Sequence, residues 1–169
     1  MNTSISSHDH TPPRAKSSQS GFTLIEILVV IGIIAIIATV VLIAINPARQ
    51  FAQARNSQRV SNVNAILNAI GQRIADNKGV FESGCAAGAI PTSATVMKNS
   101  AGGYDIAPCL VPTYIAALPF DPSAAGAHYT SNTDYDTLYD VTRDAVTGRI
   151  TVNVPAASQE LGQVISITR

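Results

Sequence analysis

The stretch from Phe22 to Ile45 reads FTLIEILVVIGIIAIIATVVLIAI, and Glu26 is its only charged residue. An α-helix of these 24 residues is about 36 Å long, enough to cross a hydrocarbon core of roughly 30 Å. The sequence therefore predicts a membrane-spanning helix. A carboxylate inside such a helix costs about 2.5 to 3.5 kcal/mol on insertion scales, so Glu26 needs a partner or a function.

The start of this span carries a recognisable junction. Gly21 directly precedes Phe22, and the acid Glu26 follows within an uninterrupted apolar run. This combination resembles the processing motif of type IV prepilins, in which a prepilin peptidase cuts after the glycine and the new terminal phenylalanine is N-methylated. The resemblance implies cleavage between Gly21 and Phe22, methylation of Phe22, and a role for Glu26 in meeting the terminal amine of an adjacent subunit.

The chemistry of Glu26 agrees with that role. A carboxylate and an ammonium are each costly to bury alone, whereas contact between them offsets much of the lost hydration. Only a subunit at the correct axial offset would satisfy the acid, so Glu26 is predicted to fix the register of assembly. The alternative is a plain signal anchor whose glutamate reaches the membrane interface, which leaves Gly21 and the spacing unexplained.

The residues before the span form a polar leader, 1–21, that lacks an apolar core of its own. This argues against a conventional secretory signal peptide. Charge alone does not orient the span, because Arg14 and Lys16 precede it and three arginines within residues 46–59 follow it. The family's peptidase works at the cytoplasmic face, so the resemblance implies a cytoplasmic leader and an extracytoplasmic head.

A second helical segment, 46–78, is predicted after the span. Asn46 and Pro47 would cap or kink the helix, which then continues toward a stop signal at Gly79. Apolar residues recur at spacings of three and four, at Val60, Val63, Leu67, Ile70 and Ile74. Polar residues are expected on the other faces, at Asn62, Asn64, Asn68, Gln72 and Arg73. The pattern is that of an amphipathic helix with one buried face.

The remaining residues, 79–169, are predicted to form one globular head. β-branched and aromatic residues predict strands at 128–130, 137–141, 149–154 and 163–168, with a turn at Thr147-Gly148. A three- or four-stranded antiparallel sheet follows from this pattern. A long helix packed on such a sheet is similar to type IV pilins and type II secretion pseudopilins, so the expected fold class is α+β.

Two cysteines, Cys85 and Cys109, lie between helix and sheet. In a small extracytoplasmic domain they predict one disulfide, whose loop of about 25 residues would contribute about 3.5 kcal/mol in the chain-entropy model. Free thiols in a redox or metal site are the alternative, but there is no CxxC motif and no histidine nearby.

Two further features of the sequence can each be interpreted in two ways. Leu118–Pro122 looks like the Pro-x-Asp-Pro segment of major pseudopilins, or is a rigid turn made by its prolines and aspartate. Four aspartates could bind calcium or form a solvated acidic edge. We favour the acidic edge, because the spacing of the aspartates is not that of an EF-hand. They are Asp134, Asp136, Asp140 and Asp144.

Composition excludes several classes of function. The chain has 11 basic and 11 acidic residues and no tryptophan, which disfavours a strongly basic nucleic-acid groove or a stacking platform. It contains no HExxH, GxSxG, Walker or Rossmann pattern. We expect neither enzymatic activity nor a cofactor.

The sequence thus predicts a structural subunit that polymerises through its apolar helix into an extracellular type IV pilus. The resemblance implies as partners other copies of the chain, a prepilin peptidase and methyltransferase, an inner-membrane platform protein and an assembly ATPase. Before assembly the chain would contact membrane lipid. A pseudopilin of a secretion or competence system and a non-polymerising membrane-anchored binding module remain alternatives. Adhesion, motility and DNA uptake are not distinguished.

Overall fold

The computed structural model describes residues 21–169, which fall into two compact units that meet between Ala44 and Ile45. The predicted leader lies outside the described residues except for Gly21. The first unit contains helix α1, Leu24–Ala44, in which no residue is buried. With 21 residues, α1 is long and apolar enough to cross a membrane, as predicted.

Helix α2, Pro47–Asp76, opens the second unit. The chain leaves the helical conformation between Ala44 and Pro47, and Asn46 caps α2 by accepting a hydrogen bond from the Arg49 N–H at 3.3 Å. Proline has no N–H to donate to the preceding turn. The predicted bend at Pro47 is therefore a complete interruption, with two helices in place of one bent helix.

The end of α2 follows the sequence prediction. The Asn77 N–H donates to the Arg73 carbonyl at 3.0 Å and closes the helix. Lys78 and Gly79 then take φ angles of 57° and 91°, in the left-handed region that glycine adopts readily.

The buried face of α2 is broader and more polar than the sequence predicts. Val63, Leu67 and Ile70 are buried, as expected. Asn62 and Arg73 were expected on solvent-facing sides and are buried instead. A helical period identifies apolar residues on one face, but it cannot recognise a polar residue whose hydrogen-bond partners come from elsewhere in the chain.

The sheet has five strands, all paired antiparallel. They are β1 (Thr95–Lys98), β2 (His128–Ser131), β3 (Asp134–Arg143), β4 (Ile150–Asn153) and β5 (Ser166–Thr168). The order is β1-β3-β4-β5, and β2 also pairs with β3. The four predicted strands are present with shifted ends, whereas β1 was missed. A short helix α3 (Ala107–Leu110) and a 3₁₀ turn (Ala156–Ser158) complete the fold.

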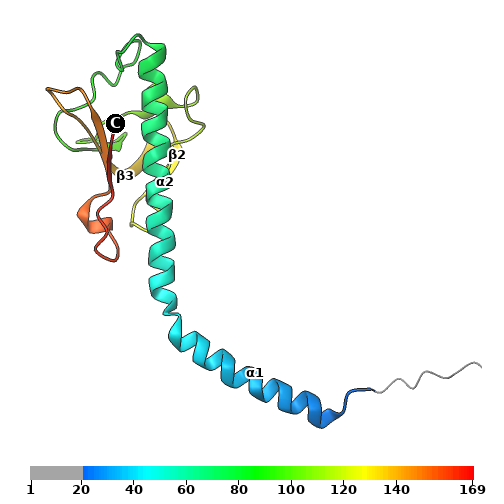
Figure 1. The fold of residues 1–169 in the computed structure, drawn as a ribbon. Coiled ribbons are helices and arrows are strands. Elements are labelled where there is room, and N and C mark those ends of the chain that lie inside the picture. Colours follow the sequence, from blue (N-terminus) through cyan, green and yellow to red (C-terminus); the bar gives the residue numbers. More distant parts are fainter. Residues whose placement is uncertain (1–20) are drawn as a thin grey trace, which may run out of the picture. The chain divides into compact units, whose positions relative to one another are not determined.

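The core lies between α2 and the sheet, and Figure 1 shows the long helix running alongside the strands. Ile150, Val152 and Val154 are buried in it, so β4 presents the predicted alternating face. Gly148 closes the β3–β4 turn with a φ of 71°, in agreement with the predicted turn. The α+β fold is thus the one expected from the sequence.

The predicted disulfide joins Cys85 to Cys109, with their Cα atoms 5.5 Å apart. The Arg73 side chain ties the same region to α2. It donates hydrogen bonds to the carbonyls of Phe81 at 2.7 Å, Ser83 at 2.6 Å and Cys109 at 2.9 Å. The buried Arg73 side chain therefore fixes the chain near both cysteines to α2, and the disulfide joins the two cysteines to each other.

Candidate assembly site

The predicted processing junction lies in accessible chain. Gly21 and Phe22 are exposed and precede the first helical residue, and the Phe22 side chain is 79% exposed. A peptidase could therefore reach the bond between Gly21 and Phe22 without unwinding any part of α1.

Glu26 forms a reciprocal cap with Thr23 at the start of α1. The Thr23 hydroxyl accepts a hydrogen bond from the Glu26 N–H at 3.3 Å, and the Glu26 carboxylate accepts one from the Thr23 N–H at 3.4 Å. This is a capping box, in which two unpaired backbone N–H groups of a helix terminus are satisfied at once. It turns the carboxylate toward the N-terminal end of α1, where cleavage would create the amine of Phe22.

Sequence reasoning singled out Glu26 but not Thr23. The signal was available, because threonine followed by glutamate three residues later before an apolar run is the sequence form of a capping box. Thr23 therefore belongs to the candidate site as the residue that positions the acid.

The rest of α1 offers only apolar surface. Its one internal hydroxyl, on Thr39, donates to the Ala35 carbonyl of the same helix at 2.8 Å and needs no outside partner. Among the described residues of α1, Leu24–Ala44, none is buried. Such a surface is stable only in lipid or against other apolar helices.

A buried ion-pair network joins the first half of α2 to the head. Arg59 is 1% exposed, and its guanidinium donates to both carboxylate oxygens of Asp121 at 2.8 and 3.1 Å. It also donates to Glu160 at 2.7 Å, Asn56 at 2.9 Å and Ser123 at 2.8 Å. All five N–H groups of the side chain are thereby used. Arg59 joins α2 to two segments that are distant in sequence.

The Pro-x-Asp-Pro segment owes its position to this network. Asp121 is 2% exposed, pairs with Arg59, and accepts hydrogen bonds from the N–H groups of Ser123 and Ala124 at 2.9 and 2.8 Å. Asp121 thus begins a local turn through Ser123 and Ala124, and neither interpretation of Leu118–Pro122 is decided by these contacts. Sequence reasoning missed the buried ion pair, because the two partners are 62 residues apart.

These contacts shift the pKa values of the Asp121 and Glu160 carboxyl groups. Burial raises the pKa of Asp121, but hydrogen bonds from Arg59 and from two backbone N–H groups outweigh it and bring the pKa below its usual value. Hydrogen bonds from Arg55 and Arg59 lower the pKa of Glu160 from 4.5 to about 2.

Acid is therefore expected to destabilise the head. A carboxyl group whose pKa is lower in the folded state stabilises the fold above its unfolded pKa, and this contribution is lost as the pH falls through the folded pKa. For Glu160 that window runs from pH 4.5 down to about 2. Thermal unfolding of the full chain across this window should show a falling Tm. The Glu160→Gln variant should lose less Tm over the same range, and an equal loss would show that Glu160 does not contribute.

The four aspartates considered for calcium serve local contacts. Asp144 accepts hydrogen bonds from the N–H groups of Val146 and Thr147 in the β3–β4 turn, at 3.0 and 2.6 Å. Asp134 lies 3.2 Å from the ring of His128. No three His, Cys, Asp or Glu side chains within residues 21–169 form a group suited to a metal ion. The arrangement of Asp134, Asp136, Asp140 and Asp144 thus gives the calcium hypothesis no support.

Comparison with known proteins adds one finding. A family model described as the prokaryotic N-terminal methylation motif matches residues 16–42, which include Gly21, Phe22 and Glu26. Neither the curated proteins nor the solved structures gave a significant match. The matched motif is the one on which the sequence prediction rested, and the α+β fold agrees with it. The chain carries the signature of the type IV pilin and pseudopilin family.

Proposed function

We propose that this protein is the structural subunit of a type IV pilus, assembled through α1 after cleavage between Gly21 and Phe22. The observation that supports this most directly is α1 itself, which is apolar on every side, has no buried residue, and carries one acid at its first turn. The methylation motif at 16–42 supports a pilin or pseudopilin-like protein. Both point to a structural role and not to catalysis.

Assembly would exchange one apolar surrounding for another. In the membrane, lipid covers α1, and in a filament the α1 helices of other copies would do so, which is nearly neutral in hydrophobic energy. Specificity must then come from the polar group. The Glu26 carboxylate would pair with the methylated amine of Phe22 on an adjacent copy, where each charge lowers the cost of burying the other.

Localisation and partners follow from the same proposal. The peptidase acts from the cytoplasmic side, so the head would lie outside, an oxidising location that suits the Cys85–Cys109 disulfide. Because transferring α1 from lipid into a filament supplies little free energy by itself, an assembly ATPase and a platform protein in the inner membrane would be needed to extract subunits from the membrane.

A pseudopilin is the second candidate. It is supported by the likeness of Leu118–Pro122 to the pseudopilin segment, together with the burial of Asp121 in the head. A pseudopilin would use α1 and Glu26 in the same way but build a short periplasmic fibre. A membrane-tethered binding module is less well supported, because it has no need for Glu26.

Electron microscopy of producing cells, with antibody against the head, distinguishes these functions. We expect long labelled surface filaments that disappear when the gene is deleted. Label confined to the cell envelope, with the subunits crosslinked into short oligomers, would identify a pseudopilin. Label confined to the envelope with monomers only would contradict both assembly functions and leave the tethered module.

A further inference from the structure

A hollow of about 180 Å³ lies where the end of α2 meets the β3–β4 turn. Ile74 lines it from the last turns of α2, and Phe81, Ile90 and Ile150 line it from other segments of the head. The last three side chains are buried, so they form an apolar base. None of the lining residues belongs to the Arg59 network or to the candidate assembly site. The assembly function therefore does not explain this hollow.

Two opposite charges, those of Glu82 and Arg143, line the same hollow. Both side chains are exposed, and neither forms an ion pair with the other or with any other residue that the structure describes. A Cβ atom added to Gly148 would lie 3.9 Å from Nη2 of Arg143, which places the guanidinium beside this glycine in the turn. Opposite charges that share a hollow without pairing leave space between them for a ligand that carries both charges.

The backbone that carries these two side chains is fixed. The Glu82 carbonyl accepts a hydrogen bond from the Cys85 N–H at 3.0 Å, and Arg73 bonds to the carbonyls on either side of Glu82 at 2.7 and 2.6 Å. The Arg143 N–H donates to the Pro91 carbonyl at 2.8 Å. Both charges are therefore presented by a preorganised backbone, which reduces the entropy lost when a ligand binds.

We propose that this hollow binds a free α-amino acid with an aliphatic side chain. Such a molecule is a zwitterion at neutral pH. Its carboxylate matches the planar guanidinium of Arg143, and its ammonium matches the carboxylate of Glu82. Its side chain would cover the apolar base. The proposal gives the head a ligand and does not depend on the assembly function.

Volume and charge exclude other classes of ligand. About 180 Å³ is well below the roughly 300–1,000 Å³ of pockets for drug-sized molecules and close to the cavity of about 150 Å³ that holds benzene. A nucleotide or an oligosaccharide is therefore too large. An inorganic anion would pair with Arg143 but would place a second negative charge beside Glu82, and an uncharged apolar molecule would leave both charges without a partner.

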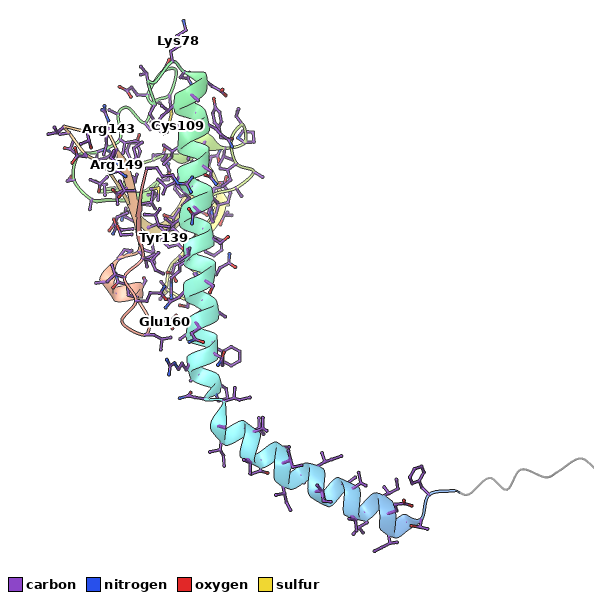
Figure 2. The ribbon with its side chains drawn as sticks, in the orientation of Figure 1. Lys78, Cys109, Tyr139, Arg143, Arg149 and Glu160 are labelled. Carbon is purple, nitrogen blue, oxygen red and sulfur yellow. A yellow bond between two sulfur atoms is a disulfide. The ribbon has the colours of Figure 1, made fainter. Side chains whose placement is uncertain are left out.

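The hollow is far from the point where the two units of the chain are joined. Ile74 lies about 40 Å along α2 from Pro47, at a rise of about 1.5 Å per residue. In Figure 2, Arg143 lies in the half of the head that contains Lys78, whereas Glu160 lies in the other half, where α2 begins. Small solutes can reach the hollow from solution, because the side chains of Glu82 and Arg143 are exposed.

Calorimetric titration of the full chain in detergent with L-leucine tests the proposal, after subtraction of a titration into detergent alone. We expect saturable binding at one site. Two analogues of the same size identify the charges that are recognised. L-leucinamide lacks the carboxylate, and L-2-hydroxy-4-methylpentanoate lacks the ammonium group. Each should bind about tenfold or more weakly than L-leucine, because each loses one charge-assisted contact.

Substitutions connect the binding to the hollow. Arg143→Met and Glu82→Gln should each weaken L-leucine binding by about tenfold or more. Both side chains are exposed and outside any ion pair, so the Tm should not change. Arg149→Met and Asp76→Asn are the matched controls. They remove an exposed charge of each sign close by in sequence, but neither residue lines the hollow, and binding should persist.

Three results would overturn the proposal. The first is the absence of saturable L-leucine binding by wild-type protein that melts cooperatively. The second is equal binding of L-leucine and the hydroxy acid, which would indicate a site for simple carboxylates. The third is wild-type affinity in either Arg143→Met or Glu82→Gln. Filament formation is measured separately, so the proposed function and this site can each fail without the other.

Discussion

Replacing Arg59 with methionine is expected to lower the free energy of unfolding of the head by about 3 to 5 kcal/mol. The substitution keeps an apolar stem of similar length but leaves Asp121, which is 2% exposed, without its cation. Glu160 loses one of its two arginine partners at the same time. Urea unfolding of the full-length protein in detergent, followed by circular dichroism, measures the change.

Two further variants isolate the cause. Arg149→Met removes an exposed arginine that takes no part in the network and should change the unfolding free energy by no more than about 0.5 kcal/mol. Adding Asp121→Leu to Arg59→Met should recover part of the loss, because the orphaned carboxylate is then absent. A loss below about 1 kcal/mol for Arg59→Met alone would mean that the network does not hold the head together.

Replacing Glu26 with glutamine is expected to abolish most filament assembly without preventing membrane insertion or processing. The amide keeps the shape of the side chain but not the charge that would meet the terminal amine of Phe22. Removing one partner of a buried charge pair costs about 2 kcal/mol or more, which corresponds to a loss of about thirtyfold or more in association. Quantifying sheared filaments against the processed membrane pool measures this.

Thr39→Ala is the matched control for Glu26→Gln. It also removes a polar group from α1, but the Thr39 hydroxyl is already bonded to the Ala35 carbonyl within the helix. Assembly should therefore persist. Filaments of Glu26→Gln in wild-type amounts would show that the acid sets no register and would favour the membrane-tethered module.

Local patterns explain which parts of the fold the sequence predicts. The apolar run of α1 and the alternation of Ile150, Val152 and Val154 each lie in one continuous stretch, and both are found as expected. Strand β1 is only four residues long, Thr95–Lys98, and it pairs with β3, about 40 residues away. So short a strand carries no clear period, and its partner decides its conformation.

The same distinction between local and distant contacts explains which parts of the candidate sites the sequence predicts. The residues of the junction, from Gly21 to Glu26, are neighbours in sequence, so the motif and the Thr23–Glu26 cap can both be read directly. Arg59 and Asp121 are 62 residues apart, and Glu160 lies a further 39 residues on from Asp121. Nothing local to either position indicates a buried ion pair, because an arginine or aspartate in isolation is expected at the surface.

The proposed assembly depends on processing at the junction, and the intact mass of the protein from its native membrane or sheared surface fraction measures that processing directly. We expect a chain that begins at Phe22, carries one added methyl group and retains the Cys85–Cys109 disulfide. A chain that still contains residues 1–21 in cells that possess the peptidase would contradict the pilin and pseudopilin functions alike and leave a membrane-anchored domain.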